Sequence, residues 1–150
     1  MADIKLIKLI DDLSWNKSEE EQRRAMDRIR KFPGFEYDYL IRFGTEKDCW
    51  DNCAKLICEL PDERLKSLIP RLLEWLQDMN WPGAYTVFNR LMALPSSMLK
   101  RPFEITVLRA DLMKDDLWIE SLALFCDKKE LMCEINAEVR MILENAKNNE

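Results

Sequence analysis

Tryptophans at nearly regular intervals are the feature of this sequence that most restricts its fold. Four of the five are separated by 35, 31 and 37 residues: Trp15, Trp50, Trp81 and Trp118. Repeats built from pairs of helices have periods from the low thirties to the high forties. One such pair cannot bury its apolar face alone, so stacked pairs form the core. The spacing therefore predicts a stack of helix pairs.

The residues after three of these tryptophans repeat a helical pattern. The third position after Trp50, Trp81 and Trp118 holds a small residue, and the sixth and seventh positions hold apolar residues. Offsets of three, six and seven trace one face of an α-helix. Pro61 and Pro95 then end two of these helices. Each of the three tryptophans is therefore predicted at or near the start of the second helix of its pair, and all four repeated tryptophans are predicted to pack in the core.

The first unit departs from this register. A polar run, residues 16–22, follows Trp15, and the apolar pattern begins seven residues late, at Ala25. Ser18 and Glu21 have the spacing of a capping box. On the same predicted helix, acidic residues precede basic ones, which suits the helix dipole and predicts a solvated face. The alternative is a basic patch that meets a partner or a phosphate.

Apolar stripes before the tryptophans predict the first helix of each pair. These stripes lie in residues 6–13, 35–43 and 65–76. Pro70 interrupts the third stripe and predicts a kink or a break. Pro102 is predicted to open the next helix, and residues 129–146 are predicted to form a last helix that caps the stack. No segment alternates as a strand would.

The fold expected from these patterns is all-α. We expect residues 1–150 to form a single domain, a right-handed stack of about eight or nine HEAT-like helices without a sheet. Apolar runs are too short for a membrane span, which needs about 18 residues. The N-terminus has no uninterrupted apolar core like that of a signal peptide, so we expect a cytoplasmic protein.

The usual catalytic and metal-binding motifs are missing from this sequence, although its plentiful carboxylates leave an Asp- or Glu-based hydrolase as an alternative. The sequence contains no histidine, which removes the commonest general base and the commonest metal ligand. The five cysteines lack the tight pairs of a zinc site, so we interpret them as reduced core thiols. Glycine-rich phosphate loops and nucleophile elbows are missing as well. We therefore predict no catalytic residue, no bound metal and no cofactor.

The acidic balance of the chain indicates the chemistry of a partner. The formal net charge is −5 and the pI about 5.0, which argues against nucleic acid and favours a basic protein. Acids recur near the tryptophans, and we predict that they share one binding face: Asp48, Asp51, Asp78, Asp115 and Asp116. The competing interpretation is that each of them caps a helix or turn.

Two aromatic residues are the predicted apolar anchors of that face. Trp75 lies outside the register of the repeated tryptophans. Tyr37 lies off the stripe formed by Phe35, Tyr39 and Phe43. Because neither follows the pattern of a buried face, we predict that both are exposed. Buried aromatic anchors supply much of the binding energy in protein interfaces.

Three segments carry a resemblance to a known family. They are Leu72-Leu73-Glu74-Trp75-Leu76-Gln77-Asp78-Met79-Asn80-Trp81-Pro82-Gly83-Ala84, Trp50-Asp51-Asn52-Cys53-Ala54-Lys55 and Asp115-Asp116-Leu117-Trp118. Over about residues 48–120 the chain resembles a family of small bacterial HEAT-like proteins catalogued as a domain of unknown function. The resemblance implies a helical-repeat fold and supplies no catalytic residue. Similar small acidic proteins occur as immunity or accessory proteins around bacterial toxin systems.

Three functions follow from the fold and the charge. The first is a non-enzymatic protein-binding module, in its most concrete form an immunity protein that neutralises a basic toxin. The second is a nucleic-acid enzyme of the HEAT-like DNA glycosylase kind, which a clear positive groove would favour. The third is a scaffold or accessory protein with no link to toxins.

Overall fold

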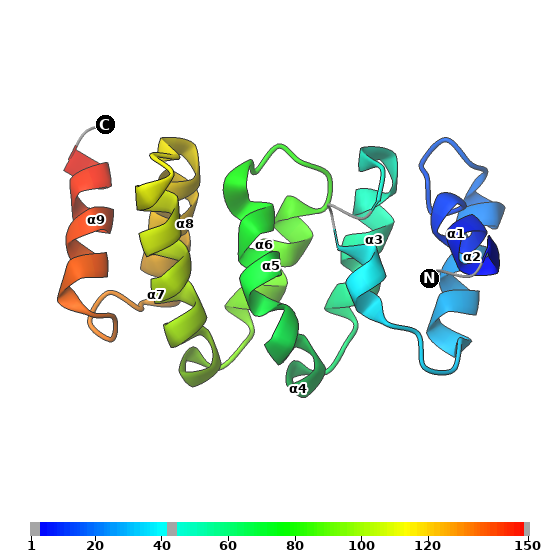
Figure 1. Cartoon of the computed structure of the whole chain (residues 1–150), viewed down its shortest axis with the longest axis horizontal. Coiled ribbons are helices and arrows are strands. Elements are labelled where there is room, and N and C mark those ends of the chain that lie inside the picture. The colour runs from blue at the N-terminus through cyan, green and yellow to red at the C-terminus, as the bar shows by residue number, and fades with distance from the viewer. Residues whose placement is uncertain (1–3, 42–44, 149–150) are drawn as a thin grey trace.

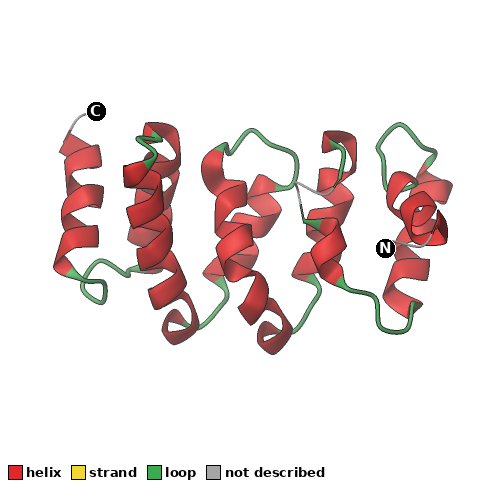
Figure 2. Ribbon diagram, viewed as in Figure 1, coloured by secondary structure: helices red, strands yellow, loops and turns green. Residues whose placement is uncertain are grey.

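Helices joined by short loops make up the computed structural model, which describes residues 4–41 and 45–148. No strand occurs among these residues. Successive helices stand side by side in one row along the longest axis, with the N-terminal and C-terminal helices at opposite ends (Figure 1). The absence of a sheet from the described part is equally plain in Figure 2. No helix of this part is long and apolar enough to cross a membrane.

The N-terminal end of the row consists of α1 (Ile4–Asp11) and α2 (Glu19–Lys31). The predicted Ser18 cap of α2 is confirmed, because the Ser18 hydroxyl accepts from Glu21 N at 3.1 Å. The Glu21 carboxylate accepts from the Ser18 hydroxyl, at 3.1 Å, and not from the Ser18 backbone N–H as a full capping box requires. The expectation that Trp15 packs in the core is wrong. The late start of α2 leaves Trp15 in a loop with no helix face beneath it, and 52% of its surface is exposed.

A 3-10 turn stands where a helix over residues 35–43 was expected. This turn is η1 (Tyr37–Leu40), and Phe43 lies outside the described residues. The aromatic rings pack edge-on against one another, with 5.3 Å between the centroids of Phe35 and Tyr37. Tyrosine and aspartate are weaker helix formers than leucine or alanine. A short 3-10 turn forms here instead of a helix, and it buries Leu40.

The middle of the row begins with η3 (Lys47–Cys49) and α3 (Trp50–Cys58). The following stripe forms α4 (Asp62–Leu65), η4 (Lys66–Leu68), α5 (Ile69–Glu74) and η5 (Trp75–Gln77). The break predicted at Pro70 is confirmed, since Pro70 stands in the first turn of α5. The missing N–H of a proline removes no helical hydrogen bond there.

The C-terminal part consists of α6 (Ala84–Met92), α7 (Ser96–Leu112), α8 (Asp116–Lys129) and α9 (Ala137–Asn148). The expectation that Pro102 opens a helix is wrong, because α7 starts after Pro95 and Pro102 lies inside it. The last helix also begins later than predicted. Glu130 ends α8 with φ of 59°, and the connection to α9 buries Leu131.

The tryptophans pack in several different environments. Trp118 is fully buried, and its indole N–H donates to Leu73 O at 3.0 Å. Trp50 and Trp81 are half-buried, and Trp50 contacts the rings of both Trp75 and Trp81 edge-on. Trp50 opens α3 and Trp118 lies in the first turn of α8, as predicted, whereas Trp81 precedes α6 by three residues.

The expectation that Trp75 is exposed is wrong. Its exposed fraction is 0%, and its indole N–H donates to Pro82 O at 2.9 Å. Trp75 continues the apolar stripe of α5, because Leu68, Leu72 and Trp75 follow at helical spacing and all are buried. One cluster of buried apolar side chains extends from α2 to α9.

Four of the five thiols are embedded in or against this core. Burial raises the pKa of Cys49 and Cys53 to about 12, and that of Cys58 and Cys126 to about 11, from the ordinary 9.0. Water stabilises a thiolate far better than an apolar interior does, so the neutral thiol is favoured. Cys133 is exposed.

We therefore expect Cys133 alone to react rapidly with a thiol reagent at pH 8, and the other four to react only as the chain unfolds. Stability should also fall as pH rises from about 9 towards 11–12, because the unfolded thiols ionise first. Timed titration with a chromogenic disulfide reagent, with and without denaturant, measures the first effect. Rapid reaction of all five thiols without denaturant would contradict it. That the thiols bind no metal stays a prediction.

Candidate functional site

Three of the five predicted acids hold turns and helix ends together. The Asp48 carboxylate accepts a hydrogen bond from the Ser14 hydroxyl. Asp78 Oδ1 accepts from Asn80 N at 2.8 Å, and Asp115 Oδ1 caps α8 by accepting from Trp118 N at 3.1 Å. All three are half-buried. Each of these acids therefore has a local structural role, as the competing interpretation expected.

The other predicted residues lie in separate places. Asp51 is exposed in the first turn of α3, and Asp116 is exposed in the first turn of α8. Tyr37 is half-buried, with the Arg64 guanidinium 5.2 Å from the centroid of its ring. Trp75 is inside the core and cannot contact a partner. Of this set, Asp116 lines a groove.

That groove, which we call the α8–α9 groove, lies between α8 and α9 beside the end of α7. Its volume is about 440 Å3. Four carboxylates line it: Asp111, Asp116, Glu120 and Glu138. Apolar side chains line it between these acids: Ile119, Met141, Ile142 and Ala146. It therefore combines negative charge with an apolar floor.

The four carboxylates of the α8–α9 groove are not engaged in ion pairs with any residue that the structure describes. Within residues 4–41 and 45–148, none of them forms an ion pair, and no lysine or arginine is among the residues that line the groove. Like charges that share a concave surface raise the local potential, since low-dielectric walls focus the field. Lys147 lines a neighbouring hollow that shares Glu120 and Ala146 with the groove, and its ammonium is 2.5 Å from Asp127 Oδ1.

Exposed apolar side chains line the groove or neighbour its lining residues in the sequence. Leu112 is 83% exposed, and Met113, Leu117 and Met141 are between 54% and 61% exposed. The first three lie where α7 ends and α8 begins, between Asp111 and Ile119 in the sequence, and these two residues both line the groove. We call the three exposed residues the α7–α8 corner. Large apolar side chains grouped at one place on a surface are typical of interaction sites.

Buried polar contacts hold α9 in place against α7 and α8. Glu104, on α7, is 4% exposed, and its Oε2 accepts from Asn136 N at 2.7 Å and from Asn136 Nδ2 at 2.8 Å. Asn136 Oδ1 in turn accepts from Val139 N in the first turn of α9, at 2.9 Å. The ion pair between Lys147 and Asp127 ties the other end of α9 to α8. The groove is thus preformed.

Sequence reasoning missed most of this groove. Asp116 and Glu120 are four residues apart, a spacing that places two acids on one helix face, and this signal was available. Glu138 and Met141 join them only through the packing of α9 on α8. Among the described residues, no group of three or more His, Cys, Asp or Glu side chains is arranged to hold a metal ion.

Comparison with known proteins gives one family. The model of the family described as "Domain of unknown function (DUF5071)" matches residues 45–150. The matched part contains every residue of the α8–α9 groove, whereas α1 and α2 precede it. No curated protein and no solved structure matches the chain.

Proposed function

Because the chain belongs to the DUF5071 family, whose description states no function, we propose one from its surface: it is a non-enzymatic protein-binding module. Its α8–α9 groove takes a basic amphipathic segment of a partner protein. The observation that carries this proposal is the set of four carboxylates without ion pairs around an apolar floor. A lysine-rich or arginine-rich helix supplies the opposite charges, and its apolar face covers Ile119 and Ile142.

Charge and apolar contacts have separate roles in this proposal. The carboxylates attract the partner and orient it, which raises the association rate at low salt. Exposed charges are screened within about 8 Å at physiological ionic strength, so they supply little affinity alone. The α7–α8 corner and Met141 supply the apolar anchors in place of Trp75 and Tyr37.

The partner class follows from the same chemistry. A basic toxin neutralised by this protein as an immunity protein fits the acidic groove, and so does a basic host protein for which the module is a scaffold. Genes that flank this one separate the two cases. The nucleic-acid alternative has less support at this groove, since its acids without ion pairs repel phosphates.

We propose also that the row of helices is a right-handed stack of the HEAT type. The shared register after Trp50 and Trp81 supports it, because Cys53, Ala84 and the apolar residues that follow are buried in both helices. The register is incomplete after Trp118, where Leu124 is 48% exposed. Superposition of an experimental structure on HEAT repeats tests the assignment, and a left-handed row would contradict it.

Capture of partners from the native host tests the binding function. The test variant is Asp111→Lys/Glu120→Lys, because both side chains line the groove and neither lies in the first turn of a helix. The matched control is Glu134→Lys/Glu144→Lys, two exposed acids outside the groove that make the same change in net charge.

The proposal expects a protein that is captured at low salt by the wild type and the control variant, and is released at high salt. The groove variant should capture it at least about tenfold less well, which corresponds to about 1.4 kcal/mol. Capture that is equal for both variants, or that ignores salt, would overturn the proposal.

A further inference from the structure

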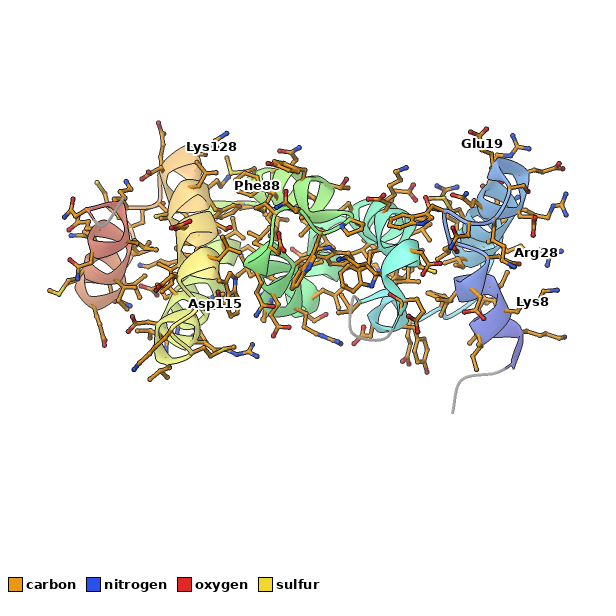
Figure 3. All side chains as sticks on the ribbon, turned by 90° about the horizontal axis from the view of Figure 1, so that it is seen from above. Lys8, Glu19, Arg28, Phe88, Asp115 and Lys128 are labelled. Carbon is orange, nitrogen blue, oxygen red and sulfur yellow. The ribbon has the colours of Figure 1, made fainter. Side chains whose placement is uncertain are left out.

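A second groove lies at the opposite end of the row, between α1 and α2. This α1–α2 cleft has a volume of about 1040 Å3, which exceeds that of the α8–α9 groove. Its floor is apolar and contains Leu9, Ala25 and Phe32. Cationic side chains stand on both sides: Lys5 and Lys8 on α1, and Arg24, Arg28 and Lys31 on α2. Figure 3 shows Lys8 and Arg28 extending outward at this end of the molecule.

The acids that line this cleft are already engaged. Asp12 lies 3.7 Å from the Lys17 ammonium, Asp27 accepts from Arg30 at 2.8 Å, and Glu21 accepts from the Ser18 hydroxyl at 3.1 Å. Among the cations, Arg24 pairs with Glu20 at 2.8 Å, whereas Lys8, Arg28 and Lys31 form no ion pair within the described part of the chain. The cleft therefore carries positive charge that the protein does not neutralise, although the chain as a whole is acidic.

The geometry points to one class of ligand: we propose that the α1–α2 cleft binds an acidic amphipathic helix of a partner protein. Arg24, Arg28 and Lys31 are spaced four and three residues apart, so they follow one edge of α2 over about 10 Å. Carboxylates with the same spacing on a ligand helix that lies parallel or antiparallel to α2 can each lie beside one of these cations. Lys5 and Lys8 face the opposite flank of the ligand helix.

The size of the cleft and its floor agree with such a ligand. Two turns of helix, about 10 Å across and 11 Å long, occupy roughly 800 Å3, which is close to the volume of the cleft. The apolar stripe of the ligand covers Leu9 and Phe32, whereas a phosphate backbone offers nothing apolar to place there. A membrane surface is flat and leaves a concave floor uncovered. The net charge of −5 also repels a long polyanion more than a short acidic helix.

This site is distinct from the one proposed for the basic partner. It lies in α1 and α2, before the residues matched by the family model. Residues 1–44 contain equal numbers of acidic and basic side chains, so the whole net charge of −5 comes from residues 45–150. The two ends of the molecule therefore select partners of opposite charge.

A model peptide tests the cleft directly in the full-length protein. The probe is a fluorescein-labelled helix of about 18 residues, long enough for partial helicity, with leucines on one stripe and glutamates on both flanks. Its control is a peptide of the same composition whose leucines and glutamates are scrambled. Fluorescence anisotropy at low salt gives the Kd for each, and a double-stranded oligonucleotide is the third probe.

The protein variants are Lys8→Glu/Arg28→Glu and, as the milder change, Lys8→Ala/Arg28→Ala. The matched control is Lys66→Glu/Lys100→Glu, two exposed lysines outside both grooves. Circular dichroism melting establishes that each variant is folded. The charge reversal should raise the Kd of the amphipathic peptide at least about tenfold, the alanine variant about threefold, and the control less than twofold.

The variant Asp111→Lys/Glu120→Lys should bind the acidic peptide no more weakly than the wild type. The peptide test of the α1–α2 cleft is therefore independent of whether the α8–α9 groove binds a basic partner. Equal binding of the scrambled peptide, no measurable binding of the amphipathic one, or no effect of the charge reversal would overturn the proposal. Tighter binding of the oligonucleotide than of the peptide would assign the cleft to nucleic acid and would also overturn it.

Discussion

Replacement of Trp75 by alanine should lower the free energy of unfolding by about 3–5 kcal/mol, the range typical of a buried tryptophan. The side chain is completely buried, and its ring lies edge-on to Trp50 with 6.3 Å between centroids. Truncation removes these contacts, leaves a cavity and deprives Pro82 O of the indole donor. Urea denaturation monitored by circular dichroism measures the loss.

Trp81→Ala is the comparison for this prediction. Trp81 is half-buried, and its ring lies edge-on to that of Trp50 with 5.7 Å between the centroids. Its removal therefore leaves a space that water can enter. We expect a loss of stability clearly smaller than that of Trp75→Ala. The order is the reverse of the one that the tryptophan spacing suggests. A larger loss of stability for Trp81→Ala would show that Trp75 is not the main packing residue among the three contacting tryptophans, Trp50, Trp75 and Trp81.

Gly83→Ala should destabilise the protein by about 2–4 kcal/mol. Gly83 has φ of 83°, a left-handed conformation that costs an L-residue roughly 1–2 kcal/mol. An added Cβ would also lie 2.7 Å from Ala54 Cβ and 2.9 Å from Trp50 O. Because the second of these atoms belongs to the backbone of α3, relief needs movement of α3 against α6, and overpacking of this kind typically costs 1–3 kcal/mol.

Gly34→Ala is the matched control. Gly34 has φ of 69°, yet an added Cβ meets no atom within 4 Å. Only the conformational penalty applies there, so we expect a loss of about 1 kcal/mol. Both variants carry the conformational penalty of a positive φ. The difference between their losses of unfolding free energy therefore measures the cost of the close approach of α3 and α6. Equal losses in the two variants would mean that the contact at Gly83 is readily relieved.

Sequence periodicity predicted the elements of the fold better than their environments. The break at Pro70 and the cap at Ser18 depend on local chemistry, and both were predictable. Pro102 inside α7 was not, since a proline opens a helix or interrupts one depending on what precedes it. Trp75 is buried because it continues the α5 stripe, and the spacing of the other tryptophans does not reveal that position.

The candidate site was less predictable for a physical reason. An acid that recurs near a helix start has two uses, to cap the helix or to face solvent, and sequence does not separate them. Asp78 holds a turn and Asp115 caps α8, whereas Asp116, the neighbour of Asp115, is exposed and lines the groove. Glu138 lies opposite Glu120 only because Glu104 and Asn136 fix the start of α9.

In the proposed function, recognition at the α8–α9 groove would proceed from attraction to burial. The four carboxylates would draw in a basic segment, and the apolar residues of the groove with the α7–α8 corner would hold it once water is displaced. Because polar contacts hold both ends of α9, we expect such binding to cost little conformational entropy. An acidic face without this apolar component would bind weakly and without specificity.

Mapping of amide chemical shifts on titration with the captured partner tests this claim most directly. The account predicts that the largest changes fall on the α7–α8 corner and on groove residues of both helices, such as Ile119, Glu120 and Met141, and that they are lost in Asp111→Lys/Glu120→Lys. Changes centred on Asp51 and Tyr37, or on the α1–α2 cleft, with the α8–α9 groove unaffected, would contradict it.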